Sequence, residues 1–301
     1  MSTMLRRAAK LLLPGPAKQA ASAWYGRIKM ERARKAFAAA ETADGFLPPA
    51  ELESLMKDGH RAPEVIRYDP EGLTLRAAEK AGQIAGRVDL QKINASLELG
   101  CMDGMVAAEL AKRGLAAHAL DLNNAAFDAR AKSAGVRFIT GNAEAMPVES
   151  ASMDLVYSFA AFEHFERPDR VIEESYRVLK KGGHLFLLFG PVYTSPYGRH
   201  AYRQIPVPYC HYLFSEEDLH RYAASHALAH DWPYVNGWTV TQYRALWDHW
   251  RGRFNEHFYK EHPTGGVGAE LIARYPGAFR KKVKHVEDLF VSAVELCWEK
   301  S

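Results

Sequence analysis

The sequence predicts an α/β protein whose central sheet is mostly parallel and covered by helices on both faces. Between residues 96 and 188, short apolar runs of strand length alternate with segments of helical periodicity. The alternation begins at 96–104, where an apolar run leads into a glycine-bounded turn and then a helix. Strands that alternate with helices favour a parallel sheet, which binds its ligand at the carboxyl ends of the strands.

The turn at 96–104 predicts a nucleotide-like ligand. Residues 96–99 have the pattern of a short buried strand, and residues 105–113 that of an amphipathic helix that Gly114 can end. Glycine in such a turn lets backbone N–H groups approach a ligand, because no Cβ stands in the way. The N-terminus of the helix that follows favours electron-rich groups.

The other elements of the alternation follow in order. A helix at 72–88 has the apolar spacing needed to cover the first strand. Further strands are expected at 116–120, 136–140, 155–158 and 184–188, with helices at 124–132 and 168–179.

Three polar residues stand where strands of this sheet end. Glu98 lies near the end of the first strand. Asp121 closes the second about 20 residues after the glycine turn, the spacing of a carboxylate that accepts from ribose hydroxyls. Asn142 follows the third strand and can read an adenine edge through its amide. Each has a plainer interpretation, because acids at strand ends also cap helices and asparagine after Gly141 is an ordinary turn former.

Composition and cysteine usage bound the class of protein. With 301 residues, of which 48% are apolar, the chain can bury a full core as one large domain with an appendage or as two small ones. No apolar run approaches the roughly 20 residues that cross a bilayer. Cys101, Cys210 and Cys297 are far apart and form no C-x-x-C pair, which disfavours a disulfide framework and a structural zinc site.

The first 35 residues carry an uneven share of the charge. They hold nine basic residues and one acid, Glu31, and so carry +8, whereas the rest of the chain carries −5. Such an arm suits phosphates, an anionic lipid surface or an acidic partner, although a solvated helix has the same composition. The opening at 4–13 also resembles a transit peptide, but it is too short and interrupted for a secretory signal. We therefore expect a cytoplasmic protein, with peripheral contact at a membrane surface as one role for the arm.

Six motifs between residues 97 and 183 together resemble a known family. They are LELGCMDG at 97–104, LD at 120–121, GNAEAMP at 141–147, MDLVYS at 153–158, FEH at 162–164 and RVLKKGG at 177–183. The run is similar to the core of class I S-adenosylmethionine-dependent methyltransferases, in the broad group related to ubiquinone and sterol methylating enzymes. The last three motifs in that order are specific to the family, whereas the first alone is not.

The resemblance implies a Rossmann-like seven-stranded methyltransferase sheet with helices on both faces. Its last strand is antiparallel, and 290–298 is the candidate for it. The chain would then comprise a basic arm with a helical lead-in (1–89), a cofactor-binding core (90–190), an acceptor-side insertion with a helical and loop cap (191–285), and the final strand (286–301).

The resemblance also implies S-adenosylmethionine as the cofactor. By position, it assigns the methionine part to Glu98, Gly100 and Gly104, the sulfonium side to Ser158, the ribose to Asp121, and the adenine to Leu122, Asn142 and Ala143.

Two positions of the cofactor site depart from the family pattern. The family usually has glycine where this chain has Met102, and aspartate more often than asparagine at position 142. A side chain at Met102 either narrows the cofactor site or turns outward. A catalytically silent protein with an assembly or regulatory role therefore stays open beside the enzyme.

The segment 190–214 is expected to build the acceptor site. It follows the fifth strand and contains four prolines, several tyrosines and two histidines, which is typical of a stiff, aromatic-lined loop. A hydroxyl acceptor benefits from a base that takes its proton, and histidine is the usual one. His200 and His211 are the candidates, followed by His164 after the fourth strand, although each can simply cap the core of the insertion. His200 and His211 with Glu163 or His164 could also form a metal site, but their spacing matches no compact ligand motif, so no metal is expected.

The chain beyond residue 214 is expected to form a helical cap. Residues 215–219 have the features of a helix start, with serine first and acids in the first turn. Aromatic residues recur at near-helical spacing over 241–259, which favours packing of a cap over the acceptor side.

These inferences lead to one function and two alternatives. We expect the chain to transfer a methyl group from S-adenosylmethionine to a small organic or saccharide acceptor, more readily at oxygen than at nitrogen or carbon. The alternatives are a lipid-linked or quinone-type acceptor at a membrane surface, and the silent protein. A nicotinamide cofactor is disfavoured because the turn lacks G-x-G-x-x-G, and nucleic acid because no Pro-Pro-aromatic motif follows the fourth strand. The sequence leaves the oligomeric state open.

Overall fold

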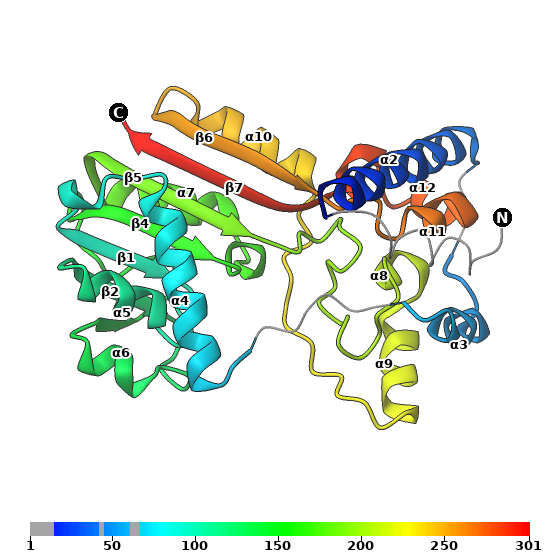
Figure 1. Ribbon diagram of the computed structural model, residues 1–301, viewed down its shortest axis with the longest axis horizontal. Coiled ribbons are helices and arrows are strands. Elements are labelled where there is room, and N and C mark those ends of the chain that lie inside the picture. The colour runs from blue at the N-terminus through cyan, green and yellow to red at the C-terminus, as the bar shows by residue number, and fades with distance from the viewer. Residues whose placement is uncertain (1–14, 42–44, 61–66) are drawn as a thin grey trace.

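A computed structural model describes residues 15–41, 45–60 and 67–301, which include a seven-stranded sheet with helices on both faces (Figure 1). The strands are β1 (Ala95–Leu99), β2 (Ala116–Asp121), β3 (Arg137–Thr140), β4 (Met153–Phe159), β5 (Leu179–Phe189), β6 (Phe254–Pro263) and β7 (Val291–Lys300). Their order is β3-β2-β1-β4-β5-β7-β6. The first five strands pair in parallel, and β7 pairs antiparallel with β5 and β6. The predicted sheet and its antiparallel last strand are confirmed.

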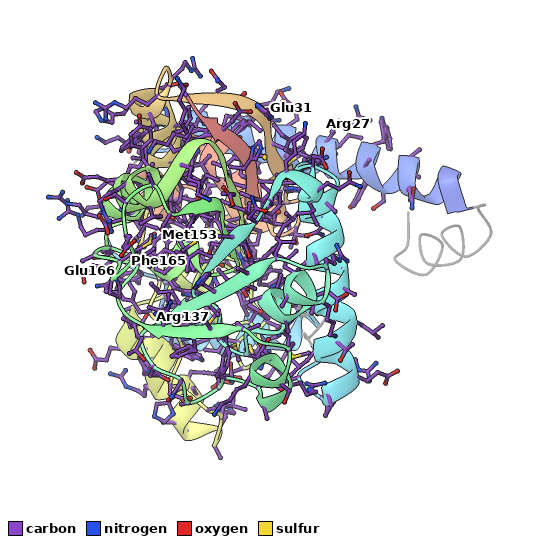
Figure 2. All side chains as sticks on the ribbon, turned by 90° about the vertical axis from the view of Figure 1, so that its left-hand side faces the viewer. Arg27, Glu31, Arg137, Met153, Phe165 and Glu166 are labelled. Carbon is purple, nitrogen blue, oxygen red and sulfur yellow. The ribbon has the colours of Figure 1, made fainter. Side chains whose placement is uncertain are left out.

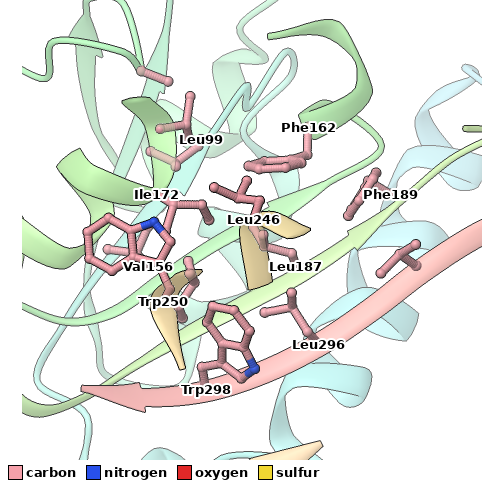
Figure 3. Close-up of a cluster of buried hydrophobic side chains, with 14 of the residues drawn as sticks. Leu99, Val156, Phe162, Ile172, Leu187, Phe189, Leu246, Trp250, Leu296 and Trp298 are labelled. Carbon is pink, nitrogen blue, oxygen red and sulfur yellow. The ribbon is translucent and has the colours of Figure 1, made fainter. Parts of the chain in front are cut away.

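Two layers of helices enclose this sheet. The first layer packs against one face of the sheet in a buried cluster and comprises helices α4 (Pro70–Ala85), α5 (Met105–Lys112) and α6 (Ala129–Ser133). The second layer packs against the other face in a second buried cluster and comprises α7 (Pro168–Val178) and α10 (Val240–Trp250). Along β4, Leu155 and Tyr157 belong to the first cluster and Val156 to the second. Successive side chains of a strand point to opposite faces, so a strand covered on both sides is apolar throughout. Figure 3 shows the second cluster, which includes Val156, Trp250 and Trp298.

A second group of helices faces the carboxyl ends of the parallel strands (Figure 1). It comprises α2 (Gly15–Ala39), α3 (Pro49–Lys57), α8 (Cys210–Leu213), α9 (Glu216–Ser225), α11 (Ala269–Arg274) and α12 (Pro276–Arg280). These helices share one buried cluster, with Phe37, Leu55, Tyr209 and Phe279 among its members. Segments from both ends of the chain therefore fold together over the ligand edge of the sheet.

Helix α2 joins this group through a backbone contact between glycines. A Cβ on Gly26 would lie 2.3 Å from the carbonyl oxygen of Gly265, so only glycine allows the approach. An ion pair of 2.6 Å between Lys29 and Glu270 fixes the same helix to α11. The turns of α2 that precede Arg27 extend beyond the rest of the molecule (Figure 2).

The structure describes only part of the basic N-terminal arm. The transit-peptide-like opening at 4–13 lies outside the described residues. Within the described ranges, no helix is both long enough and apolar enough to cross a membrane.

The near-helical spacing over 241–259 spans a helix and a strand, and its aromatic residues pack in the core. Helix α10 ends at Trp250, the chain turns at Gly252 with a φ of 92°, and Phe254 begins β6. Strand β6 pairs with β7 along its whole length, and these backbone hydrogen bonds, rather than the local pattern, decide its conformation.

The helix expected at 124–132 is also shorter than predicted. Helix α6 begins at Ala129, because the Asp128 side chain accepts a hydrogen bond from the backbone N–H of Arg130 and caps the helix there.

Candidate active site

The turn after β1 has the backbone that a ligand-binding glycine turn requires. Gly100 and Gly104 have φ values of 65° and 69°. A Cβ on Gly100 would lie 2.5 Å from the Cβ of Ala161, and one on Gly104 would lie 2.3 Å from the ring of Phe127. Both positions therefore exclude a side chain, and the turn packs closely against the loop that follows β4.

Met102 adopts a backbone conformation that favours glycine. Its φ of 48° lies in the left-handed region, which costs a residue with a side chain about 1 kcal/mol. The side chain is 47% exposed, so it is not packed into the core of the turn. The turn thus keeps its shape around methionine.

Asp121 links the end of β2 to this turn. Its Oδ2 accepts from the backbone N–H of Met102 at 2.9 Å, and its Oδ1 accepts from that of Leu122 at 2.8 Å. Each carboxylate oxygen has a further lone pair, so the group can still accept from ribose hydroxyls. Leu122 is 68% exposed and offers an apolar surface at the same edge. The positions of both residues suit the predicted contacts with ribose and adenine.

Glu98 is buried between β1 and α5. Its Oε2 accepts from the backbone N–H of Ala107 at 3.1 Å and from the hydroxyl of Tyr157 at 3.4 Å. Burial raises the pKa of this carboxyl to about 8, although the positive charge of Lys80 acts in the opposite direction.

Two cations on α4 lie beside the glycine turn and the end of β4, and the sequence reasoning did not single them out. Arg76 forms a part-buried ion pair with Asp103 of the turn. The ammonium of Lys80 lies 4.8 Å from the ring centroid of Phe159, at the end of β4. The sequence does contain a sign of this pair, because two cations spaced i, i+4 on the predicted helix lie on the same face. Such a pair can hold the carboxylate of an amino-acid moiety.

Three other predicted cofactor residues have partners within the fold. Ser158 is buried, and its Oγ donates to the carbonyl oxygen of Leu99 at 2.9 Å. Asn142 Oδ1 accepts from the backbone N–H of Glu144 at 2.9 Å, as a turn former does. Ala143 is buried in the core. The roles of these residues toward the cofactor stay predictions.

On the acceptor side, the structure brings His164 and His200 together. Their ring centroids lie 4.9 Å apart. His164 Nδ1 donates to the carbonyl oxygen of Tyr234 at 2.5 Å, and His200 Nε2 donates to that of Pro191 at 2.9 Å. Burial lowers the pKa of His200 to about 4, so this ring is neutral at pH 7. The pair lies close to the glycine turn, because His164 follows the Ala161 loop.

His211 has different surroundings. It is buried in the helical group, 4.8 Å from the ring centroid of Tyr193 and 4.5 Å from that of Tyr212. Its Nε2 donates to the carbonyl oxygen of Tyr193 at 2.7 Å. Burial lowers the pKa of His211 to about 3. These contacts suit a residue that caps the core of the insertion, and its role as a base stays a prediction.

Aromatic and cationic side chains complete the acceptor side. The guanidinium groups of Arg76 and Arg203 each lie 5.5 Å from the ring centroid of Tyr68. The Tyr202 ring lies 6.4 Å from that of His200. Rings with a few polar and charged tips are typical of sites that bind organic molecules.

Comparison with known proteins identifies the core of the chain. Residues 97–187 match a family model described as a methyltransferase domain. The chain is similar to the malonyl-(acyl-carrier protein) O-methyltransferase of Methylococcus capsulatus, with 47% identity over 57 residues, or 19% of this chain and 21% of that protein. The enzyme of the same name from Enterobacter lignolyticus is 27% identical over 176 residues, or 58% and 68% of the two chains.

Two further proteins extend the comparison. The ubiquinone/menaquinone biosynthesis C-methyltransferase of Rhizobium etli is 36% identical over 84 residues, or 25% of this chain and 33% of that protein. The solved structure of an S-adenosylmethionine dependent methyltransferase from Mesorhizobium loti is 16% identical, with a TM-score of 0.47, and the match covers 75% of this chain and 100% of that chain. This chain spans about a fifth of the first relative and about two thirds of the second.

The matched residues are those that build the ligand edge of the sheet. They run from β1 to β5 and include the glycine turn, Asp121 and the loop of His164. The agreement supports an enzyme with S-adenosylmethionine as its cofactor rather than the silent alternative. We conclude that residues 97–187 form a methyltransferase domain similar to that of S-adenosylmethionine-dependent methyltransferases.

Proposed function

We propose that the chain methylates an oxygen atom of a small organic or saccharide acceptor, which binds between the glycine turn and the segment 190–209. The observation that carries the proposal is the pairing of His164 with His200 beside the loop that packs on Gly100. Each imidazole has one nitrogen bonded to a backbone carbonyl, and the other can meet an acceptor hydroxyl. The names of the two O-methyltransferase relatives also support oxygen.

The residues of the ligand edge fit the cofactor. The turn at 100–104 has no room for a Cβ at its glycines, Asp121 retains acceptor capacity, and Leu122 offers an exposed apolar surface. When bound, S-adenosylmethionine supplies an electrophilic methyl group.

The chain itself contributes orientation and proton transfer. Tyr68 and Tyr202 hold the acceptor and exclude water, so that its oxygen faces the cofactor in one orientation. A free imidazole nitrogen of His164 or His200 accepts the hydroxyl proton.

The proposal is tested by methyl transfer from labelled S-adenosylmethionine to a panel of hydroxylated aromatics, monosaccharides and carrier-linked carboxylic acids. We expect an O-methylated product, identified by mass spectrometry. His200→Ala should lower kcat by about 100-fold and leave the affinity for S-adenosylhomocysteine unchanged. His249→Ala, on the exposed face of α10, is the matched control. A product methylated at nitrogen or carbon, or full activity of His200→Ala, would contradict the proposal.

An acceptor at a membrane surface is the second candidate, and helix α2 is the observation that favours it. Trp24 is 61% exposed, and Arg27, Arg32 and Lys35 are exposed on the same helix. A tryptophan among cations suits the headgroup region of an anionic bilayer. A lipid-linked or quinone-type acceptor would then reach the active site from the bilayer.

Vesicle sedimentation tests this candidate. The protein should sediment with phosphatidylserine vesicles and not with phosphatidylcholine vesicles. The double variant Arg27→Glu/Arg32→Glu should lose this binding, whereas Arg137→Glu on the exposed edge strand β3 should keep it. If the unaltered protein stays in the supernatant with both kinds of vesicle, the candidate fails.

A further inference from the structure

Glu163, His164 and His200 form a compact cluster at the acceptor side of the active site. One ligand atom from each residue lies within 4.8 Å of those of the other two. Glu163 and His164 belong to the short helix η2 (Phe162–His164), and His200 comes from the segment after β5. Two nitrogen donors and one carboxylate oxygen therefore meet where two separate segments approach each other.

The hydrogen bonds of both imidazoles leave one nitrogen of each ring available. His164 Nδ1 donates to the carbonyl oxygen of Tyr234, and His200 Nε2 donates to that of Pro191. Because carbonyl oxygens only accept, these nitrogens carry the protons, and His164 Nε2 and His200 Nδ1 carry lone pairs. A backbone carbonyl that fixes the tautomer and orientation of the ring is the usual support of a metal-ligating histidine.

The carboxylate of Glu163 has one oxygen without a partner. The residue is fully buried, and its Oε1 accepts from the backbone N–H of Gly190 at 3.1 Å. Its Oε2 is buried and has no hydrogen-bond partner among the described residues. Buried polar atoms of native proteins are nearly always satisfied, so an orphaned carboxylate oxygen on a residue that clusters with two imidazoles indicates a missing cation.

We propose that Glu163, His164 and His200 bind a divalent cation of the zinc class, which includes Zn²⁺, Fe²⁺, Co²⁺ and Ni²⁺. Imidazole ligands favour these ions over Mg²⁺ and Ca²⁺, which prefer oxygen donors. Three protein ligands leave at least one coordination position open, as in catalytic rather than structural sites. If the proposed function holds, that position takes the acceptor oxygen, and in the metal-bound chain water rather than an imidazole accepts its proton, because both imidazole lone pairs then bind the cation.

A second cluster of the same composition lies at the opposite end of the sheet and provides a matched control. It consists of His184, His257 and Glu299, and one ligand atom from each lies within 4.8 Å of those of the other two. Here, however, His257 Nε2 lies 3.1 Å from Glu299 Oε2, so two of the three side chains bind each other instead of a cation.

The test measures metal binding by the full chain in the absence of acceptor. Protein treated with a chelator and dialysed is titrated with Zn²⁺ by calorimetry, and with Co²⁺ by visible absorption, which reports the ligand set. We expect one strong site per chain. Glu163→Gln and His200→Ala should each weaken Zn²⁺ binding by at least about tenfold, because loss of even a supporting partner of a ligand costs that much. His257→Ala should leave it unchanged.

Binding of S-adenosylhomocysteine by each variant shows that it is folded. The proposal is overturned if the unaltered chain binds neither ion, if Glu163→Gln and His200→Ala bind both ions as the unaltered chain does, or if His257→Ala abolishes binding. Because no acceptor is present, these outcomes are independent of whether the proposed methyl transfer to oxygen is correct.

Discussion

The carboxylate of Asp121 accepts a hydrogen bond of 2.9 Å from the backbone N–H of Met102 and so ties the end of β2 to the turn that follows β1. Asp121 ends β2, and Met102 lies in the turn after the neighbouring parallel strand β1, so the bond fixes the turn at the predicted cofactor edge. The same carboxylate holds Leu122 through its N–H. One side chain thus holds both the turn after β1 and the residue after β2 at the predicted cofactor site.

Asp121→Ala is expected to weaken cofactor binding. It removes an acceptor for the ribose and frees the N–H of Met102, so the affinity for S-adenosylhomocysteine should fall by about 10- to 100-fold. Titration calorimetry measures the change. Asp89→Ala is the control, because Asp89 caps the short helix η1 (Leu90–Lys92) by accepting from the N–H of Gln91. Equal affinity of Asp121→Ala and the unaltered chain would remove Asp121 from the cofactor site.

Met102→Gly should leave folding stability nearly unchanged. Glycine relieves about 1 kcal/mol of left-handed strain but adds a similar entropy to the unfolded chain. Since the methionine side chain is half-exposed, the affinity for S-adenosylhomocysteine should change by less than about tenfold.

Met102→Ala separates the two effects of the glycine variant, because alanine removes the long side chain and keeps the strain. Urea unfolding and calorimetry on both variants provide the measurement. A large gain in affinity in both variants would mean that Met102 closes the site, contrary to its exposure.

Gly100→Ala is expected to destabilise the fold by about 3 kcal/mol, because it combines left-handed strain with a contact of 2.5 Å to Ala161. Gly114→Ala has the strain but meets nothing within 4 Å, and it should cost only about 1 kcal/mol. Adding Ala161→Gly to Gly100→Ala should recover part of the loss. A double-mutant cycle by urea unfolding tests this, and additive effects would show that the two residues do not touch.

The buried His211 should make stability depend on pH below neutrality. Its pKa of about 3 in the folded chain lies below the ordinary value of 6.5, so the unfolded chain binds the proton first as the pH falls. The stabilisation is complete above pH 6.5 and is lost progressively toward pH 3. At pH 5 this amounts to about 2 kcal/mol relative to pH 8.

His211→Gln isolates this contribution. Glutamine keeps a donor for the carbonyl oxygen of Tyr193 but does not titrate, so the free energy of unfolding should fall less between pH 8 and pH 5 than in the unaltered chain. Urea unfolding at both pH values measures the difference. Identical pH dependence of the two proteins would contradict the buried, neutral state of His211.

The sequence by itself determined the core from β1 to β5. Apolar runs of strand length, the glycines of the turn and the acid that ends β2 are local signals, and they predict where the strands and the turn of this core lie. The antiparallel β7 was also predicted, though through family resemblance rather than periodicity. Local signals suffice here because each strand of a covered parallel sheet is apolar along its whole length.

Only the tertiary structure decided the rest of the molecule. Strand β6 takes its conformation from pairing with β7, and the position of α2 depends on the contact between Gly26 and Gly265. The cluster of His164 and His200 exists because two loops, distant in the chain, end at the same edge of the sheet. Such relationships join residues far apart in sequence, where local periodicity and turn chemistry carry no information, and only the packing of the whole chain defines them.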